Sequence, residues 1–163
     1  MSVLRRMGND WTRVSLVVQG ALFAYYQVIE WVNLFPWNDI RRGNGQASLD
    51  LIVAAVLGIL ILATWRRLRW VMAVSVGLYG LWAWLQIDSW WLPYFRGAWP
   101  AWKRTYERFF GETIRFLPSD GIHLAPDACH ITLQVLIVAA FATTAIAVLQ
   151  LYLRPNRGIV GDR

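Results

Sequence analysis

The sequence predicts an all-α integral membrane protein, a four-transmembrane-helix bundle with an interfacial amphipathic helix between the third and fourth spans. The first observation is composition: the 163 residues are 57% apolar and 16% charged, with a mean hydropathy of +0.38. Soluble proteins are about 45–50% apolar and about 25% charged. The second is that four apolar stretches each reach the roughly 20 residues needed to cross a bilayer. The third is a separate stretch in which aromatic and charged residues alternate at helical spacing.

The four predicted spans belong to a single membrane domain over residues 1–163. In chain order they cover residues ~14–35, ~47–65, ~70–92 and ~126–153. Pro36 follows the first span and Pro93 the third, and proline is poorly tolerated inside a helix. Residues 51–65, 70–87 and 131–153 carry no formal charge. A buried helix of a soluble protein is rarely so long and so uncharged on every face, which favours membrane spans.

The amphipathic helix is expected over residues ~99–117, with Pro100 in its first turn and Pro118 after its end. Its apolar residues recur every three or four positions, so they share one helical face. They are Trp99, Trp102, Tyr106, Phe109, Phe110 and Leu117. An aromatic face opposite a basic face is typical of a helix lying in the membrane interface. The same pattern also fits a lid packed on the end of the bundle.

The distribution of arginine predicts the orientation in the membrane. Of the 16 basic residues, only Lys103 is a lysine, and the net charge is +6. The arginines of the second connection and the termini are Arg66, Arg67, Arg69, Arg5, Arg6, Arg13, Arg154, Arg157 and Arg163. By the positive-inside rule these segments face the cytoplasm, although the third connection is basic too. We therefore expect both termini to be cytoplasmic, in a bacterial inner or plasma membrane.

The same distribution indicates which partners the chain meets. Because the basic residues lie between apolar runs and form no stripe of their own, they favour an anionic lipid surface over nucleic acid. Membrane lipids are the expected partners. Assembly as a homo-oligomer or within a larger membrane complex stays open.

Ionisable residues of all four spans fall at one level, near the end opposite the termini. They are Glu30, Asp50, Asp88, Asp127 and His130. Such residues are costly within a membrane and need a reason. Asp50 and Asp127 lie at helix N-termini, where a carboxylate is stabilised by free N–H groups. Glu30 and Asp88 lie near helix C-termini, where a carboxylate has no such stabilisation. Glu30, Asp88 and His130 are therefore the candidate catalytic residues.

The helical faces extend this layer into a candidate ligand-binding site. Asp127, His130 and Gln134 share a polar stripe on the fourth span, and Gln27 shares a face with Glu30 on the first. Aromatic walls are expected from three tryptophans near the same level. The ligand-binding candidates are Asp50, Asp127, Gln27, Gln134, Trp31, Trp84 and Trp91.

A divalent metal is an open alternative as cofactor. His123 and His130 bracket Asp127, and imidazole and carboxylate groups are ligands for zinc, manganese and iron. The metal candidates are therefore His123, Asp127 and His130, although a histidine at the end of a span also serves to tune a neighbouring acid. Cys129 is next to His130, and adjacent helical residues diverge by about 100°. A buried, inert thiol is expected there.

Three functions fit this pattern, and whether the protein is an enzyme is left open. The preferred one is a pocket, capped by residues ~99–117, that binds or acts on a lipophilic or amphiphilic ligand by acid–base chemistry. The second is a proton-coupled small-molecule exporter working as an oligomer, with Glu30 as coupling carboxylate. Transporter sites usually lie near the membrane midplane, and here the charges lie at one leaflet. The third is an accessory or structural subunit of a larger complex.

Overall fold

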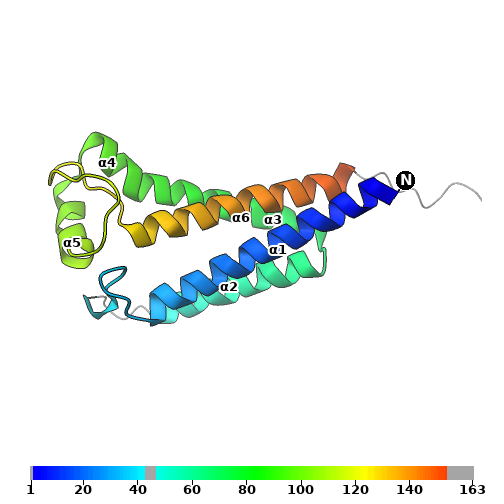
Figure 1. Ribbon diagram of the computed structural model, residues 1–163, viewed down its shortest axis with the longest axis horizontal. Coiled ribbons are helices and arrows are strands. Elements are labelled where there is room, and N and C mark those ends of the chain that lie inside the picture. The colour runs from blue at the N-terminus through cyan, green and yellow to red at the C-terminus, as the bar shows by residue number, and fades with distance from the viewer. Residues whose placement is uncertain (1, 43–46, 154–163) are drawn as a thin grey trace, which may run out of the picture.

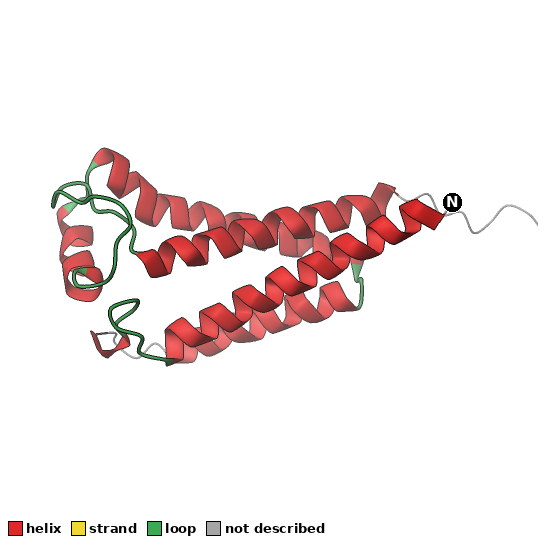
Figure 2. Ribbon diagram, in the orientation of Figure 1, coloured by secondary structure: helices red, strands yellow, loops and turns green. Residues whose placement is uncertain are grey.

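A long helical bundle forms most of the molecule. The computed structural model describes residues 2–42 and 47–153. All regular elements in these two ranges are helices, and a single isolated β-bridge joins Arg115 to Asp127 (Figure 2). The predicted all-helical fold class is therefore confirmed.

Four long helices lie side by side in the bundle (Figure 1). They are α1 (Ser2–Trp31), α2 (Ala47–Trp65), α3 (Arg69–Gln86) and α6 (Ala128–Leu153). Helix α6 packs along both α1 and α3, and α2 packs along α1. A π-helical turn, η2 (Ile87–Trp91), continues α3 into the short helix α4 (Leu92–Arg96). The bundle therefore has two ends, one at the α2–α3 hairpin and one at α4.

Three helical segments are long and apolar enough to cross a membrane. They are Ser48–Trp65, Arg69–Arg96 and Ala128–Leu153. Their outward faces carry large apolar side chains, among them Ile52, Trp70 and Leu153, with Trp70 78% exposed. Exposed apolar surface on this scale is typical of contact with lipid. The chain is therefore a membrane protein, as predicted.

Helix α1 carries several polar residues in its buried stripe. The stripe consists of Thr12, Ser15, Gln19, Leu22, Tyr26 and Ile29. The Gln19 side chain is 0% exposed, and its Nε2 lies 2.9 Å from Thr144 Oγ1 and 3.1 Å from Thr64 Oγ1. Ser15 Oγ is a third neighbour at 3.0 Å. These contacts tie α1 to α2 and α6 through hydrogen bonds.

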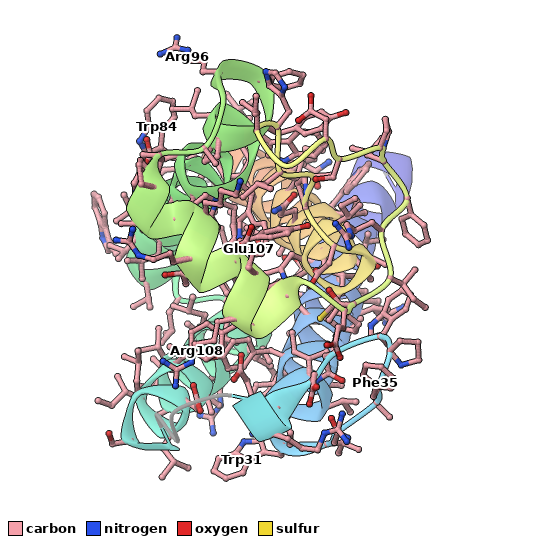
Figure 3. The ribbon with its side chains drawn as sticks, turned by 90° about the vertical axis from the view of Figure 1, so that its left-hand side faces the viewer. Trp31, Phe35, Trp84, Arg96, Glu107 and Arg108 are labelled. Carbon is pink, nitrogen blue, oxygen red and sulfur yellow. The ribbon has the colours of Figure 1, made fainter. Side chains whose placement is uncertain are left out.

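Helix α5 (Pro100–Phe110) crosses the α4 end of the bundle, as Figures 1 and 3 show. Its aromatic face packs on the bundle: Tyr106 and Trp90 are buried, and the Tyr106 hydroxyl donates a 2.6 Å hydrogen bond to the Ala125 carbonyl. Trp102 and Phe110 contact the Trp90 ring edge-on, with centroids 5.3 and 5.0 Å apart. Helix α5 thus covers this end.

The first long helix ends at Trp31, earlier than the predicted residue 35. Asn38 provides the reason, because its side chain binds the backbone where the helix stops. Its Nδ2 donates to the Ile29 carbonyl at 2.6 Å, and its Oδ1 accepts from the Leu34 N–H at 2.8 Å. A side-chain amide thus replaces the next helical turn.

The amphipathic helix is also shorter than predicted, ending at Phe110 rather than near residue 117. The following residues bond to distant segments instead. The Ile114 N–H donates to the Pro36 carbonyl at 3.0 Å, and the Ala128 N–H donates to the Ile114 carbonyl at 2.7 Å. This segment therefore ties the loop after α1 to the start of α6.

Candidate functional site

Asp127 organises the start of α6. Its side chain is 1% exposed, and its Oδ1 accepts a 2.8 Å hydrogen bond from the His130 backbone N–H. Its Oδ2 accepts a 3.0 Å hydrogen bond from the Thr113 hydroxyl. A carboxylate that accepts from the third N–H of the helix is an N-cap, the structural role expected at this position.

The His130 ring is fixed against the same carboxylate. Its Nδ1 lies 2.7 Å from Asp127 Oδ1. Trp90 lies beside the ring with centroids 4.0 Å apart, and Phe110 meets it edge-on at 5.0 Å. When the carboxylate is ionised it only accepts, so Nδ1 carries the shared proton. In the neutral imidazole the Nε2 lone pair is then free to accept a proton or to bind a metal ion.

Helices α1 and α2 bring further carboxylates to this level. Glu30 is half-buried and interacts electrostatically with both Asp50 and His130. Asp50 lies near the start of α2, and its Oδ1 accepts a 3.4 Å hydrogen bond from the Tyr26 hydroxyl of α1. The structure thus gathers ionisable groups of α1, α2 and α6, with Asp127 at the edge of this set.

A second polar group lies between α3 and α6. The Trp91 indole Nε1 donates to Gln134 Oε1 at 2.8 Å, and Gln134 Nε2 donates to Gln86 Oε1 at 3.3 Å. Two predicted ligand-binding residues, Trp91 and Gln134, are therefore in contact. Gln86 is not among the residues predicted from the sequence.

Gln27 is half-buried on α1, in the turn that precedes Glu30. Its Oε1 is buried and has no hydrogen-bond partner in the described part of the chain. A buried amide oxygen without a donor is uncommon in folded proteins, so this atom is available to a donor group.

Asp88, Trp84 and Trp31 are not brought into these contacts. Trp84 is 61% exposed, and Asp88 follows it by four residues on the same face of the helix. Within the described ranges, Asp88 makes no hydrogen bond or ion pair. Figure 3 places Trp84 and Trp31 at the periphery of the α5 end. Their predicted roles stay predictions, without a supporting contact.

Cys129 joins the predicted metal ligands. The ligand atoms of Asp127, Cys129 and His130 all lie within 4.8 Å of one another, and the first two side chains are buried. The thiol of Cys129 is buried, as expected, and the divergence of adjacent helical residues still leaves its Sγ within this distance of the His130 ring. The Tyr25 hydroxyl donates to the Cys129 carbonyl at 2.9 Å, which fixes the turn against α1.

His123, the remaining metal candidate, lies in a different environment. Its Nδ1 is 2.9 Å from Asp120 Oδ2. Asp120 Oδ1 also accepts from the backbone N–H groups of Ile122 and His123, and these hydrogen bonds hold the pKa of Asp120 below its usual value. Both residues line an open depression of about 410 Å³, which also includes Tyr94, Phe95, Pro118 and Ser119.

No protein-family model matches this sequence, and no curated protein or solved structure is significantly similar to it. The geometry at the α5 end therefore carries the functional inference by itself.

Proposed function

We propose that this chain is a four-span membrane protein that binds an amphiphilic ligand at its extracytoplasmic end and exchanges a proton with it. The observation that carries the proposal is the Asp127–His130 pair, with its 2.7 Å Oδ1–Nδ1 distance, beside the half-buried Glu30. A histidine oriented by a buried carboxylate is a common form of general base. Asp88, also predicted as catalytic, has no place in this mechanism.

Helix α1 is the fourth span in this proposal. Its 30 residues are about 45 Å long at the usual rise of 1.5 Å per residue, more than the hydrocarbon core requires. Its buried stripe holds Thr12, Ser15 and Gln19, whereas Val14, Val17 and Val28 are exposed. Because these three polar side chains face other helices, the outer surface from Val14 to Val28 suits lipid despite the lower mean hydropathy of the helix.

The proposed orientation places the α2–α3 hairpin in the cytoplasm. Arg66, Arg67 and Arg69 are all exposed there, as the positive-inside rule requires. Of the terminal arginines counted above, Arg154, Arg157 and Arg163 lie outside the described residues. With a fourth span, both termini are on the hairpin side, and α5 lies on the extracytoplasmic side.

Helix α5 then serves as an interfacial lid over the site. Its aromatic face contacts the bundle, and its exposed face carries Arg104, Glu107 and Arg108, two of which Figure 3 labels. Charged side chains on that face lie at the level of lipid headgroups. A ligand that reaches the layer of Glu30 and His130 from the membrane therefore needs an apolar part and a polar part.

The chemistry assigned to the site is proton transfer. The Nε2 atom of His130 accepts a proton from the polar group of the ligand, while Asp127 stabilises the imidazolium that forms. Glu30, which interacts electrostatically with His130, stabilises that charge as well. Such a step needs no covalent intermediate and suits either an enzyme or a proton-linked binding protein.

Native mass spectrometry of the chain purified in mild detergent tests this function. We expect a retained amphiphile in the parent protein that is lost, or retained at less than about a tenth of the level, in His130→Ala and Glu30→Gln. A tenfold loss corresponds to about 1.4 kcal/mol of binding free energy.

His123→Ala and Glu107→Gln are the matched controls, because both side chains lie outside the polar layer. They should retain the ligand at the parental level. Retention that is equal in all four variants, or no retained amphiphile in the parent, contradicts the proposed function.

A further inference from the structure

We infer that Asp127, Cys129 and His130 form a site for a zinc-class divalent cation at the start of α6. The inference rests on the proposed function in one respect, since it uses the same Asp127–His130 pair. It changes the metal set expected from the sequence by placing Cys129 where His123 was predicted.

Distance is the first reason. The ligand atoms of the three residues lie within 4.8 Å of one another, so one ion is within reach of all of them after small side-chain adjustments. Zinc binds thiolate at about 2.3 Å and imidazole or carboxylate at about 2.0–2.2 Å. His123 is held in a separate pair with Asp120 and is not part of this cluster.

Charge is the second reason. Asp127 is 1% exposed, and a buried carboxylate needs compensation in an apolar environment. A divalent cation bound by one carboxylate, one thiolate and one neutral imidazole gives a net charge of zero. On binding, the thiol proton of Cys129 leaves to solvent, and the proton between His130 and Asp127 is displaced if Nδ1 becomes the ligand.

The surroundings of the cluster favour a fixed geometry. Thr113 holds Asp127 Oδ2, and Trp90 and Phe110 restrict the His130 ring. Second partners of this kind orient metal ligands and contribute about 10–100-fold to metal affinity. Sulfur and nitrogen donors together select zinc or its substitute cobalt over magnesium or calcium.

Three protein ligands leave a fourth coordination position open, as in catalytic zinc sites. Glu30 of α1 interacts electrostatically with both Cys129 and His130, so it adds negative charge to the surroundings of the cluster.

The sequence contains its own control for this inference. The segments Asp120–His123 and Asp127–His130 both read Asp-x-x-His, and in each the aspartate accepts from the histidine Nδ1 and backbone N–H. The segments differ at both middle positions, and only the buried one has a sulfur ligand there: Gly121 and Ile122 stand in the first, Ala128 and Cys129 in the second. A metal site that depends on sulfur is therefore expected only in the segment Asp127–His130.

Cobalt titration of the purified full chain, followed by absorption spectroscopy, tests the inference. We expect about one equivalent of Co²⁺ per chain, a thiolate-to-cobalt charge-transfer band, and displacement by Zn²⁺. Cys129→Ser should abolish the band, and His130→Ala should weaken binding by about 100-fold or more, beyond the range of a second-sphere partner. His123→Ala should leave both band and affinity unchanged.

Absence of the band in the parent, or a band that persists at unchanged affinity in His130→Ala, overturns the inference. Cys129→Ser leaves the Asp127 cap in place, so the test stands even where other variants fail to fold. Repeating the ligand-retention experiment on chain stripped with a chelator separates the proposals. An amphiphile retained without cobalt binding refutes only the metal site, whereas cobalt binding without an amphiphile refutes only the ligand.

Discussion

At the scale of single residues, Asp120 and Asp127 share an Asp-x-x-His motif but differ in how much their hydrogen bonds stabilise the fold. Asp120 and Asp127 each cap a turn that contains a histidine three residues later. Asp120 is exposed, so water replaces its hydrogen bonds when they break. Asp127 is buried and also holds Thr113, so the same donors stay unsatisfied without it.

Asp127→Ala should therefore lower the free energy of unfolding by about 1–3 kcal/mol, the cost of losing an N-cap and leaving buried donors unpaired. Unfolding in mixed detergent micelles measures this change. Asp120→Ala is the matched control and should leave the unfolding midpoint close to that of the parent. Equal effects of the two substitutions would show that burial is not what distinguishes the caps.

The inward orientation of the candidate residues was predictable from the sequence where helical spacing decides the outcome. The stripe of Asp127, His130 and Gln134 lies inward as the three- and four-residue steps predict. Asp88 was predicted as a site residue from its depth in the membrane span alone, and the helical face on which it lies was not considered. On α3 the buried Ser75 and Tyr79 mark the inward stripe, and Asp88 falls with the exposed Trp84 instead. Long-range partners such as Thr113 have no signal in local spacing.

At the scale of elements, the Gln19 network shows how helices associate where lipid offers no hydrophobic driving force. Gln19, Ser15, Thr64 and Thr144 are all buried and join three helices. Interhelical hydrogen bonds in membranes contribute about 0.6 kcal/mol each on average and about 1.7 kcal/mol at most. This group was not predicted from the sequence, because the polar residues that were considered lie at the level of Glu30 and His130.

Gln19→Leu should destabilise the bundle by about 1–2 kcal/mol, because the amide bonds to several hydroxyls at once. Gln150→Leu provides the comparison, since the Gln150 Oε1 is buried without a partner in the described residues. Its removal should be neutral or stabilising. Unfolding free energies of the two variants in the same micelles decide the matter, and a larger loss for Gln150→Leu contradicts the assignment.

Helix α5 depends on a small number of buried contacts, and Tyr106 is the main polar one. Burial raises the pKa of Tyr106 above its ordinary value of 10.0. The neutral phenol therefore stabilises the docked helix fully below pH 10, and this contribution is lost only as pH rises through the higher folded-state value.

Tyr106→Phe should loosen α5 at neutral pH, because the Ala125 carbonyl loses its 2.6 Å donor. Hydrogen exchange of the α5 amides should become about tenfold faster, equivalent to about 1.4 kcal/mol. Tyr94→Phe is the control, since that hydroxyl makes no hydrogen bond to a described residue. In the parent, protection should persist at pH 10; loss of protection below that pH contradicts the role of the neutral phenol.

At the scale of the whole molecule, the hydropathy pattern was enough to predict the helical class and the three most apolar spans. It was less informative for α1, whose polar residues lower its average hydropathy although Thr12, Ser15 and Gln19 point inward. Helix ends also depend on contacts between distant segments, such as Asn38 at the end of α1 and Ile114 after α5. Those contacts explain why the predicted ends at residues 35 and 117 were too late.

The membrane topology provides the last prediction, since a bundle of three spans and one of four place the N-terminus on opposite sides. Single cysteines introduced into a Cys129→Ser background, at Ser2, Arg67 and Glu107, report the side of each segment. A membrane-impermeant maleimide should label Glu107→Cys in intact cells, and Ser2→Cys and Arg67→Cys only after permeabilisation. Labelling of Ser2→Cys together with Glu107→Cys would mean that α1 does not cross. Labelling of Ser2→Cys and Arg67→Cys without Glu107→Cys would reverse the orientation and place the Asp127–His130 pair at the cytoplasmic face.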